Sequence, residues 1–103
     1  MAKESLRRIE KRIQDLKYRL VELGDMRPGT LSVQYRNPAE AKSPFSQISY
    51  THKGKSRSEY VRPENLTTVR NEINAYKSFK STANEIIDLS IKASRIRYST
   101  RTL

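Results

Sequence analysis

Basic side chains gather around a short turn in the middle of the chain. The first cluster contains His52, Lys53, Lys55, Arg57 and Arg62, and Glu59 is the one acid among them. A second cluster near the C-terminus contains no acid and consists of Lys92, Arg95, Arg97 and Arg101. Lys and Arg side chains contact phosphate oxygens, and the neighbouring Ser and Thr hydroxyls add neutral contacts. The two clusters therefore predict a binding site for a nucleic acid.

Two features of the first cluster have an alternative explanation. Lysines on an exposed strand also prevent edge-to-edge pairing of sheets, without any ligand. Tyr50 and Tyr60 either stack on unpaired bases or form the core side of a small sheet.

If about six cations contact phosphates, the logarithm of the affinity falls with the logarithm of the salt concentration at a slope near −5.

The overall charge agrees with a polyanionic partner. The chain of 103 residues has 21 Lys and Arg against 11 Asp and Glu, which gives a formal net charge of +10. Positive charge is in excess in the first, middle and last thirds of the sequence, so it does not come from one tail. Such a field attracts polyanions at long range.

Catalytic chemistry lacks its usual components. The single histidine, His52, lies beside a turn without an obvious acid or nucleophile partner, and there is no cysteine. Glu85 and Asp88 lie three residues apart on a predicted helix, which is typical of a solvated face. Three glycines are too few for a phosphate-binding loop. We therefore expect no enzyme, no cofactor and no metal site.

The elements that would position these residues can be read from periodicity. Residues 4–23 predict a helix with a coiled-coil seam, and Gly24 is placed to end it in the left-handed conformation. The seam alternates three and four residues and consists of Leu6, Ile9, Ile13, Leu16, Leu20 and Leu23. Residues 26–62 alternate apolar and polar side chains, which predicts a three-stranded antiparallel β-meander. Within it, 37–44 is expected to be a loop, and Gly54 supplies the positive φ of a hairpin turn.

A long helix is predicted over 63–98, starting at Pro63, with a flexible tail over 99–103. A break near Ser81 and Thr82 is the alternative, because both residues are weak helix formers. The second helix is longer than the first, so some of its isoleucines lack a partner within the chain. We therefore expect a homodimer through helices 6–23 and 66–96. The fold class is α+β in a single domain, 1–103.

Three segments resemble a known family: MRPGTLSVQYR (26–36), SYTHKGKSRSEYVRPENL (49–66) and FKSTANEIIDLSIKASRIR (79–97). They are similar to small uncharacterised basic proteins of bacteria and archaea that are often encoded near transposases and on mobile elements. The resemblance covers most residues from Met26 onward and implies the same order of helix, meander and long helix. Relatives often carry closely spaced cysteines and a His-Gly-Pro-Tyr stretch after the first strand. Here that interval reads RNPAEAKSPFSQI, so no metal role carries over.

The sequence thus predicts a small non-enzymatic nucleic-acid-binding protein that serves a mobile element or phage as an accessory or regulatory factor. DNA is favoured over RNA on the resemblance alone. The alternative is a protein-interaction adaptor or inhibitor that acts through its helical surface. A larger protein or nucleoprotein complex is a further candidate partner. No leader and no run of 18 apolar residues is visible, so we expect a cytoplasmic location without a membrane anchor.

Overall fold

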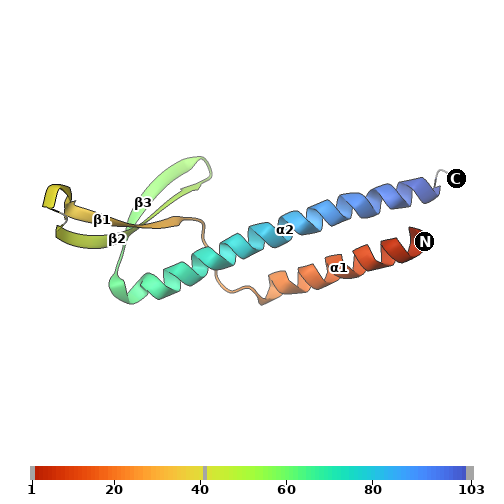
Figure 1. The fold of residues 1–103 in the computed structure, drawn as a ribbon, viewed down its shortest axis with the longest axis horizontal. Coiled ribbons are helices and arrows are strands. Elements are labelled where there is room, and N and C mark those ends of the chain that lie inside the picture. Colours follow the sequence, from red (N-terminus) through yellow and green to blue (C-terminus); the bar gives the residue numbers. More distant parts are fainter. Residues whose placement is uncertain (1, 41, 102–103) are drawn as a thin grey trace. The chain divides into compact units, whose positions relative to one another are not determined.

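The computed structural model describes residues 2–40 and 42–101 and shows an α+β fold, as predicted (Figure 1). Helix α1 comes first, three strands and two 3-10 turns follow, and helix α2 comes last. The bounds are α1 Ala2–Glu22, β1 Thr30–Asn37, a turn Pro38–Glu40, β2 Lys42–His52, β3 Lys55–Val61, a turn Pro63–Asn65 and α2 Leu66–Arg101. No helix in the described ranges is long and apolar enough to cross a membrane.

The chain forms two compact units, to which α2 contributes different parts. Residues 24–77 make the sheet unit, which holds the three strands and the first turns of α2. Residues 1–23 and 78–103 make the helical unit, which holds α1 and the rest of α2. Each unit is described by itself below.

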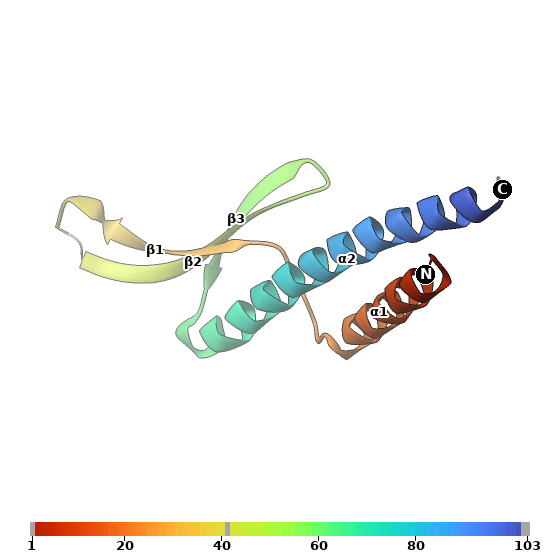
Figure 2. The ribbon, with the colours of Figure 1, turned by 45° about the vertical axis from the view of Figure 1, so that its right-hand side comes forward.

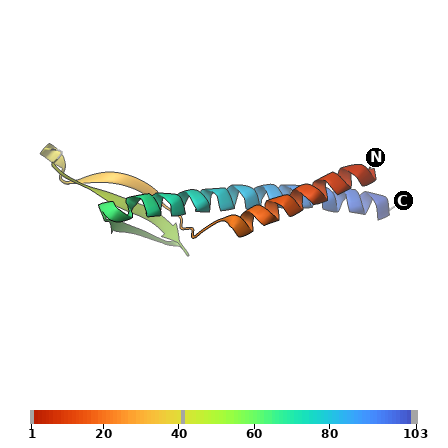
Figure 3. The same cartoon turned by 90° about the horizontal axis from the view of Figure 1, so that it is seen from below.

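The helical unit is an antiparallel pair of helices, in which the first turn of α1 lies beside the last turns of α2 (Figures 1 and 3). The predicted α1 seam is its buried side, with Ile9 and Leu16 only 8% and 1% exposed. The matching seam of α2 also alternates four and three residues and consists of Thr82, Ile86, Leu89, Ala93 and Ile96. Ala93 is fully buried, which allows the helices to approach closely. Two ion pairs, Arg12–Glu85 and Arg97–Glu10, each at 3.3 Å, join the helices beside the seam.

The sheet unit is a three-stranded antiparallel meander in the order β1-β2-β3 (Figure 2). Leu31 lies opposite Ile48 in β2, and Ile48 lies opposite Glu59 in β3. One face of the sheet packs on the start of α2, and the small core there contains Ile48, Val61, Val69 and Ile73, with Leu31 and Leu66 at its margin. A three-stranded sheet of this size is not stable alone, so the helix that covers it is part of its fold.

Several predicted details differ from the structure. Residues Lys42–Pro44 belong to β2, although 37–44 was expected to be a loop. A central strand forms hydrogen bonds to neighbouring strands on both sides, and proline has no N–H group to donate to them. Pro44 is tolerated because it pairs only with Tyr35 of β1, before β3 joins at Ser46.

The helix ends also differ from the predicted bounds. Gly24 does not have a positive φ, so it does not end α1 in the left-handed conformation. The last turn of α1 closes instead through the Leu23 N–H, which donates to the Leu20 carbonyl at 3.3 Å. Helix α2 is continuous through Ser81 and Thr82 and extends to Arg101, beyond the predicted end at 98. Residues 63–65 form the 3-10 turn that precedes it.

Candidate nucleic-acid interface

The hairpin of β2 and β3 turns through two residues. His52 pairs with Lys55, and the residues between them, Lys53 and Gly54, have φ angles of 52° and 77°. Two successive positive φ angles are the mark of a type I′ turn, whose twist matches that of the flanking strands. The predicted positive φ of Gly54 is confirmed, and Lys53 shares the left-handed region. The turn holds the Lys53 side chain at the tip of the hairpin.

Strand alternation sorts the other side chains of the hairpin onto two faces. Tyr50 and His52 share the face of buried Ile48, and the pairing places Arg57 opposite Tyr50 and Lys55 opposite His52. The face that packs on α2 near Ile48 thus becomes cationic toward the tip. His52, Lys53, Lys55 and Arg57 are all exposed. The structure therefore brings these four predicted residues together at one end of the hairpin.

Glu59, the only acid of the cluster, is bound on two sides. The Tyr50 hydroxyl donates to its Oε1 at 2.6 Å, and the Arg27 guanidinium lies 3.3 Å from its Oε2. The same guanidinium stacks over the Tyr50 ring, 4.9 Å from the ring centre. The Arg27 N–H also donates to the Glu72 carbonyl of α2, which fixes the loop that carries Arg27. Arg27 lies outside the hairpin and was not a predicted site residue.

The hydrogen bond from Tyr50 is the main cause that lowers the pKa of Glu59, and the Arg27 guanidinium lowers it further. The same hydrogen bond raises the pKa of Tyr50, because it stabilises the neutral phenol beside a carboxylate. Arg57 lowers the pKa of Glu59 through its charge as a lesser cause, yet forms no ion pair with it. Among the described residues, no acid forms an ion pair with Lys53, Lys55 or Arg57.

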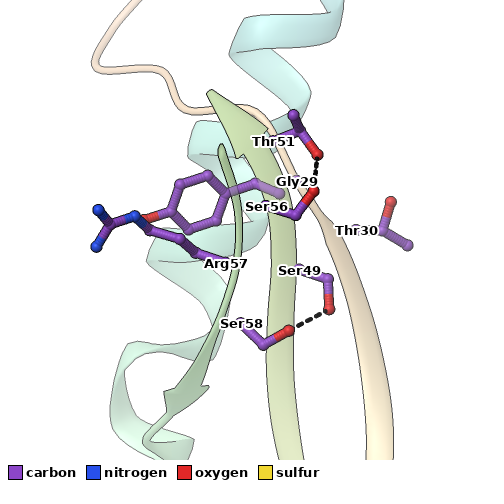
Figure 4. Close-up of a pocket in the computed structure, with 8 residues that line it drawn as sticks. Gly29, Thr30, Ser49, Thr51, Ser56, Arg57 and Ser58 are labelled. Atoms are coloured by element: carbon purple, nitrogen blue, oxygen red, sulfur yellow. Dashed lines mark hydrogen bonds between the residues drawn. The ribbon is translucent and has the colours of Figure 1, made fainter. Parts of the chain in front are cut away.

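Hydroxyl groups line the opposite face of the hairpin, as Figure 4 shows. Ser49 and Ser58 are hydrogen-bonded with their Oγ atoms 3.2 Å apart, and Thr51 and Ser56 form the next pair at 2.8 Å. These four residues border a shallow depression, which Thr30 of β1 also lines. The Arg57 side chain points to the other side of the hairpin. The sequence predicted neutral contacts from Ser and Thr hydroxyls near the cations, but it did not single out these four residues. The alternation of hydroxyl residues on either side of a two-residue turn was the signal for them.

The two tyrosines have different environments, so neither of the two alternatives applies to both. Tyr50 is half-buried on the core face, in contact with Glu59 and Arg27. Tyr60 lies on the hydroxyl face, where it is 55% exposed and its ring centre is 6.2 Å from that of Phe45. Of these two tyrosines, Tyr60 is the one whose exposed ring is available for stacking on a base.

The remaining predicted residues do not lie at the hairpin tip. Arg62 follows β3, about 23 Å of extended chain away from Lys55, and directly precedes the turn Pro63–Asn65. Lys92, Arg95 and Arg97 belong to the helical unit. The expectation that this second cluster lacks an acid is wrong, because Arg97 pairs with Glu10 of α1. Arg101 ends α2, and its side chain lies outside the described part.

Among the described residues, no group of three or more His, Cys, Asp or Glu side chains is arranged to hold a metal ion. The hairpin tip presents charged side chains on one face and hydroxyl groups on the other. Comparison of the chain with models of protein families, with curated proteins and with solved structures gave no match.

Proposed function

We propose that the tip of the β2–β3 hairpin binds the phosphate backbone of a nucleic acid through Lys53, Lys55 and Arg57. The observation that supports this most is the state of Glu59. Tyr50 and Arg27 occupy its carboxylate, so the only acid of the hairpin does not neutralise the three cations. The alternative role of these lysines is protection of the sheet edge. That role does not require an ion pair between Glu59 and Arg27, which lies outside the hairpin.

The shape of the hairpin suits this role. A two-stranded ribbon fits the major groove of duplex DNA, where cations near its tip reach the phosphates. The hydroxyls of Ser49, Thr51, Ser56 and Ser58 supply neutral contacts to phosphate oxygens from the other face. DNA is preferred over RNA because of the resemblance to proteins encoded on mobile elements. On the same ground we propose an accessory or regulatory role for a mobile element or phage. We further propose that this role is non-enzymatic and is exercised in the cytoplasm, as the sequence predicts.

A charge-reversal experiment tests this function. Lys53→Glu, Lys55→Glu and Arg57→Glu together are expected to abolish binding to a duplex of mixed sequence, as measured by fluorescence anisotropy at low salt. Each reversal replaces a phosphate contact with repulsion, and the effect on affinity is expected to exceed a hundredfold. A second variant with Gln at the same three positions removes the contacts without adding repulsion, and its loss is expected to be smaller.

The matched control changes Arg7, Arg8 and Lys11 of α1 to Glu. These side chains are exposed, and the triple substitution removes the same amount of charge from the chain. If only net charge attracts the nucleic acid, both triple variants lose affinity equally, and the proposal for the hairpin fails. Circular dichroism confirms in each case that the fold is retained.

A further inference from the structure

Helix α2 has a second apolar face within the helical unit. Its residues alternate four and three along the helix and consist of Ile87, Ile91, Ser94 and Tyr98, here called the outer stripe. At 100° per residue, the outer stripe lies about 150° around the helix from the seam that packs on α1. Ile87, Ile91 and Tyr98 are 54%, 47% and 67% exposed. The outer stripe is thus separate from the face that α1 covers.

A shallow groove follows the outer stripe. It is lined by Ile87, Ser90, Ile91, Ser94, Arg95 and Tyr98. The small serines at 90 and 94 leave space between the larger side chains of Ile87, Ile91 and Tyr98. Large and small residues that alternate in this way suit a second helix, whose side chains fill the spaces.

The sizes of the side chains at the centre of the outer stripe are complementary in an antiparallel pair. In an antiparallel pair of two outer stripes, Ile87 lies opposite Tyr98 of the second copy, and Ile91 lies opposite Ser94. Each large side chain at the centre meets a small one, and each contact occurs twice because a two-fold axis relates the helices.

The charges beside the outer stripe are also complementary in an antiparallel pair. Asp88 and Arg95 lie on the same flank of the outer stripe, one near each end, and both are exposed. A two-fold axis in the interface, perpendicular to both helices, brings the same flank of each helix together. Asp88 then faces Arg95 of the second copy, and Arg95 faces Asp88. Seven residues separate them within one helix, which is about 10 Å and too far for an ion pair between them in the same chain.

We infer that the protein forms a two-fold symmetric dimer in which two α2 helices pack antiparallel through their outer stripes. A second copy fits better than an unrelated partner, because both the sizes and the charges of this one face are complementary to themselves. The inference differs from the overhang expected from the sequence, since the exposed isoleucines result from a second face rather than from unequal helix lengths. It does not depend on nucleic-acid binding.

Multi-angle light scattering after size exclusion tests the dimer. The wild-type chain is expected to elute with twice the monomer mass at micromolar concentration. Ile87→Glu with Ile91→Glu is expected to weaken the dimer by roughly tenfold or more, because each copy then buries two charges in the interface. The control is Val21→Glu, which introduces one glutamate at an α1 position that is 81% exposed and outside the stripe. It is expected to leave the mass unchanged.

A charge-swap cycle tests the antiparallel arrangement. Asp88→Arg alone and Arg95→Asp alone each place like charges opposite one another, so both are expected to weaken the dimer. The double variant restores opposite charges and is expected to recover most of the wild-type affinity. A wild-type chain that is monomeric throughout the micromolar range overturns the dimer. Single variants that weaken it without recovery in the double variant overturn this antiparallel pairing. Neither result bears on phosphate binding by the hairpin, which the anisotropy measurement tests separately.

Discussion

Among individual residues, Glu59 is the acid of the hairpin cluster, and its contacts decide whether it pairs with the cations at the tip. Its carboxylate accepts a hydrogen bond from the Tyr50 hydroxyl and forms an ion pair with the Arg27 guanidinium, so Tyr50 and Arg27 satisfy it. Charge-assisted hydrogen bonds of this kind are stronger than those between neutral groups. Within the described part of the chain, Lys53, Lys55 and Arg57 therefore have no acid as an ion-pair partner.

Tyr50→Phe removes the hydrogen bond that contributes most to the lowered pKa of Glu59. We expect the pKa of Glu59 to rise toward its ordinary value, as measured by an NMR titration of its side-chain carboxyl. Because its pKa is lowered in the folded state, Glu59 adds stability above its unfolded pKa, and this stability is lost as the pH falls through its folded pKa. The variant is therefore expected to be less stable than the wild type at neutral pH, with the difference vanishing in acid.

Tyr60→Phe is the control for this titration. The Tyr60 side chain lies on the other face of the sheet and forms no hydrogen bond to Glu59. An unchanged pKa of Glu59 in Tyr50→Phe, or an equal rise in both variants, would contradict the role given to the Tyr50 hydroxyl.

The residue contacts were the least predictable part of the structure. Arg27 and Glu59 are 32 residues apart, and Glu10 and Arg97 are joined across two helices. Such pairs depend on how elements pack, which single-sequence periodicity does not report. The hydroxyl pairs of the hairpin are different, because the turn type fixes their register. Ser49 with Ser58 and Thr51 with Ser56 follow directly once His52 is paired with Lys55.

At the level of elements, local patterns were sufficient for the fold class. The seam of α1 repeats every three and four residues, and its members are the buried or half-buried residues of that helix. The end of the first strand was less predictable. Pro38 and Pro44 suggested a loop, but β2 remains paired with β1 at Pro44. Proline is tolerated there because β3 does not yet pair with the other side of β2.

Two glycines hold the sheet unit in shape, and substitution distinguishes their roles. Gly54→Ala is expected to cost about 1–2 kcal/mol in the free energy of unfolding, because its φ of 77° is unfavourable for a residue with a Cβ atom. No other atom lies within 4 Å of that Cβ position. Gly29→Ala is expected to cost more, since its Cβ would lie 2.6 Å from Cγ1 and Cδ1 of buried Ile48. Urea denaturation measures both.

Gly24→Ala is the matched control, because Gly24 lacks a positive φ and has no neighbour within 4 Å of the added Cβ. It is expected to be neutral or to stabilise the protein by up to about 1 kcal/mol. Equal costs at the three positions would show that the turn and the close approach to Ile48 do not matter as described.

For the whole molecule, the charge of +10 is divided between two units, in which the cations have different surroundings. In the helical unit, Arg12 and Arg97 are held in ion pairs that join α1 to α2. In the sheet unit, the cations of the hairpin tip are exposed and without an acid partner among the described residues. Composition predicted a polyanionic partner but could not distinguish these two groups of cations, because the difference lies in contacts across the fold.

The salt dependence of duplex binding tests the central claim most directly. With about six phosphate contacts, a plot of the logarithm of the association constant against the logarithm of the salt concentration has an expected slope near −5. Replacing Lys53, Lys55 and Arg57 with Gln is expected to make that slope shallower by about 3, because each lost phosphate contact removes about one unit. Binding that does not respond to salt, or a slope that is the same with and without the three hairpin cations, would contradict the claim.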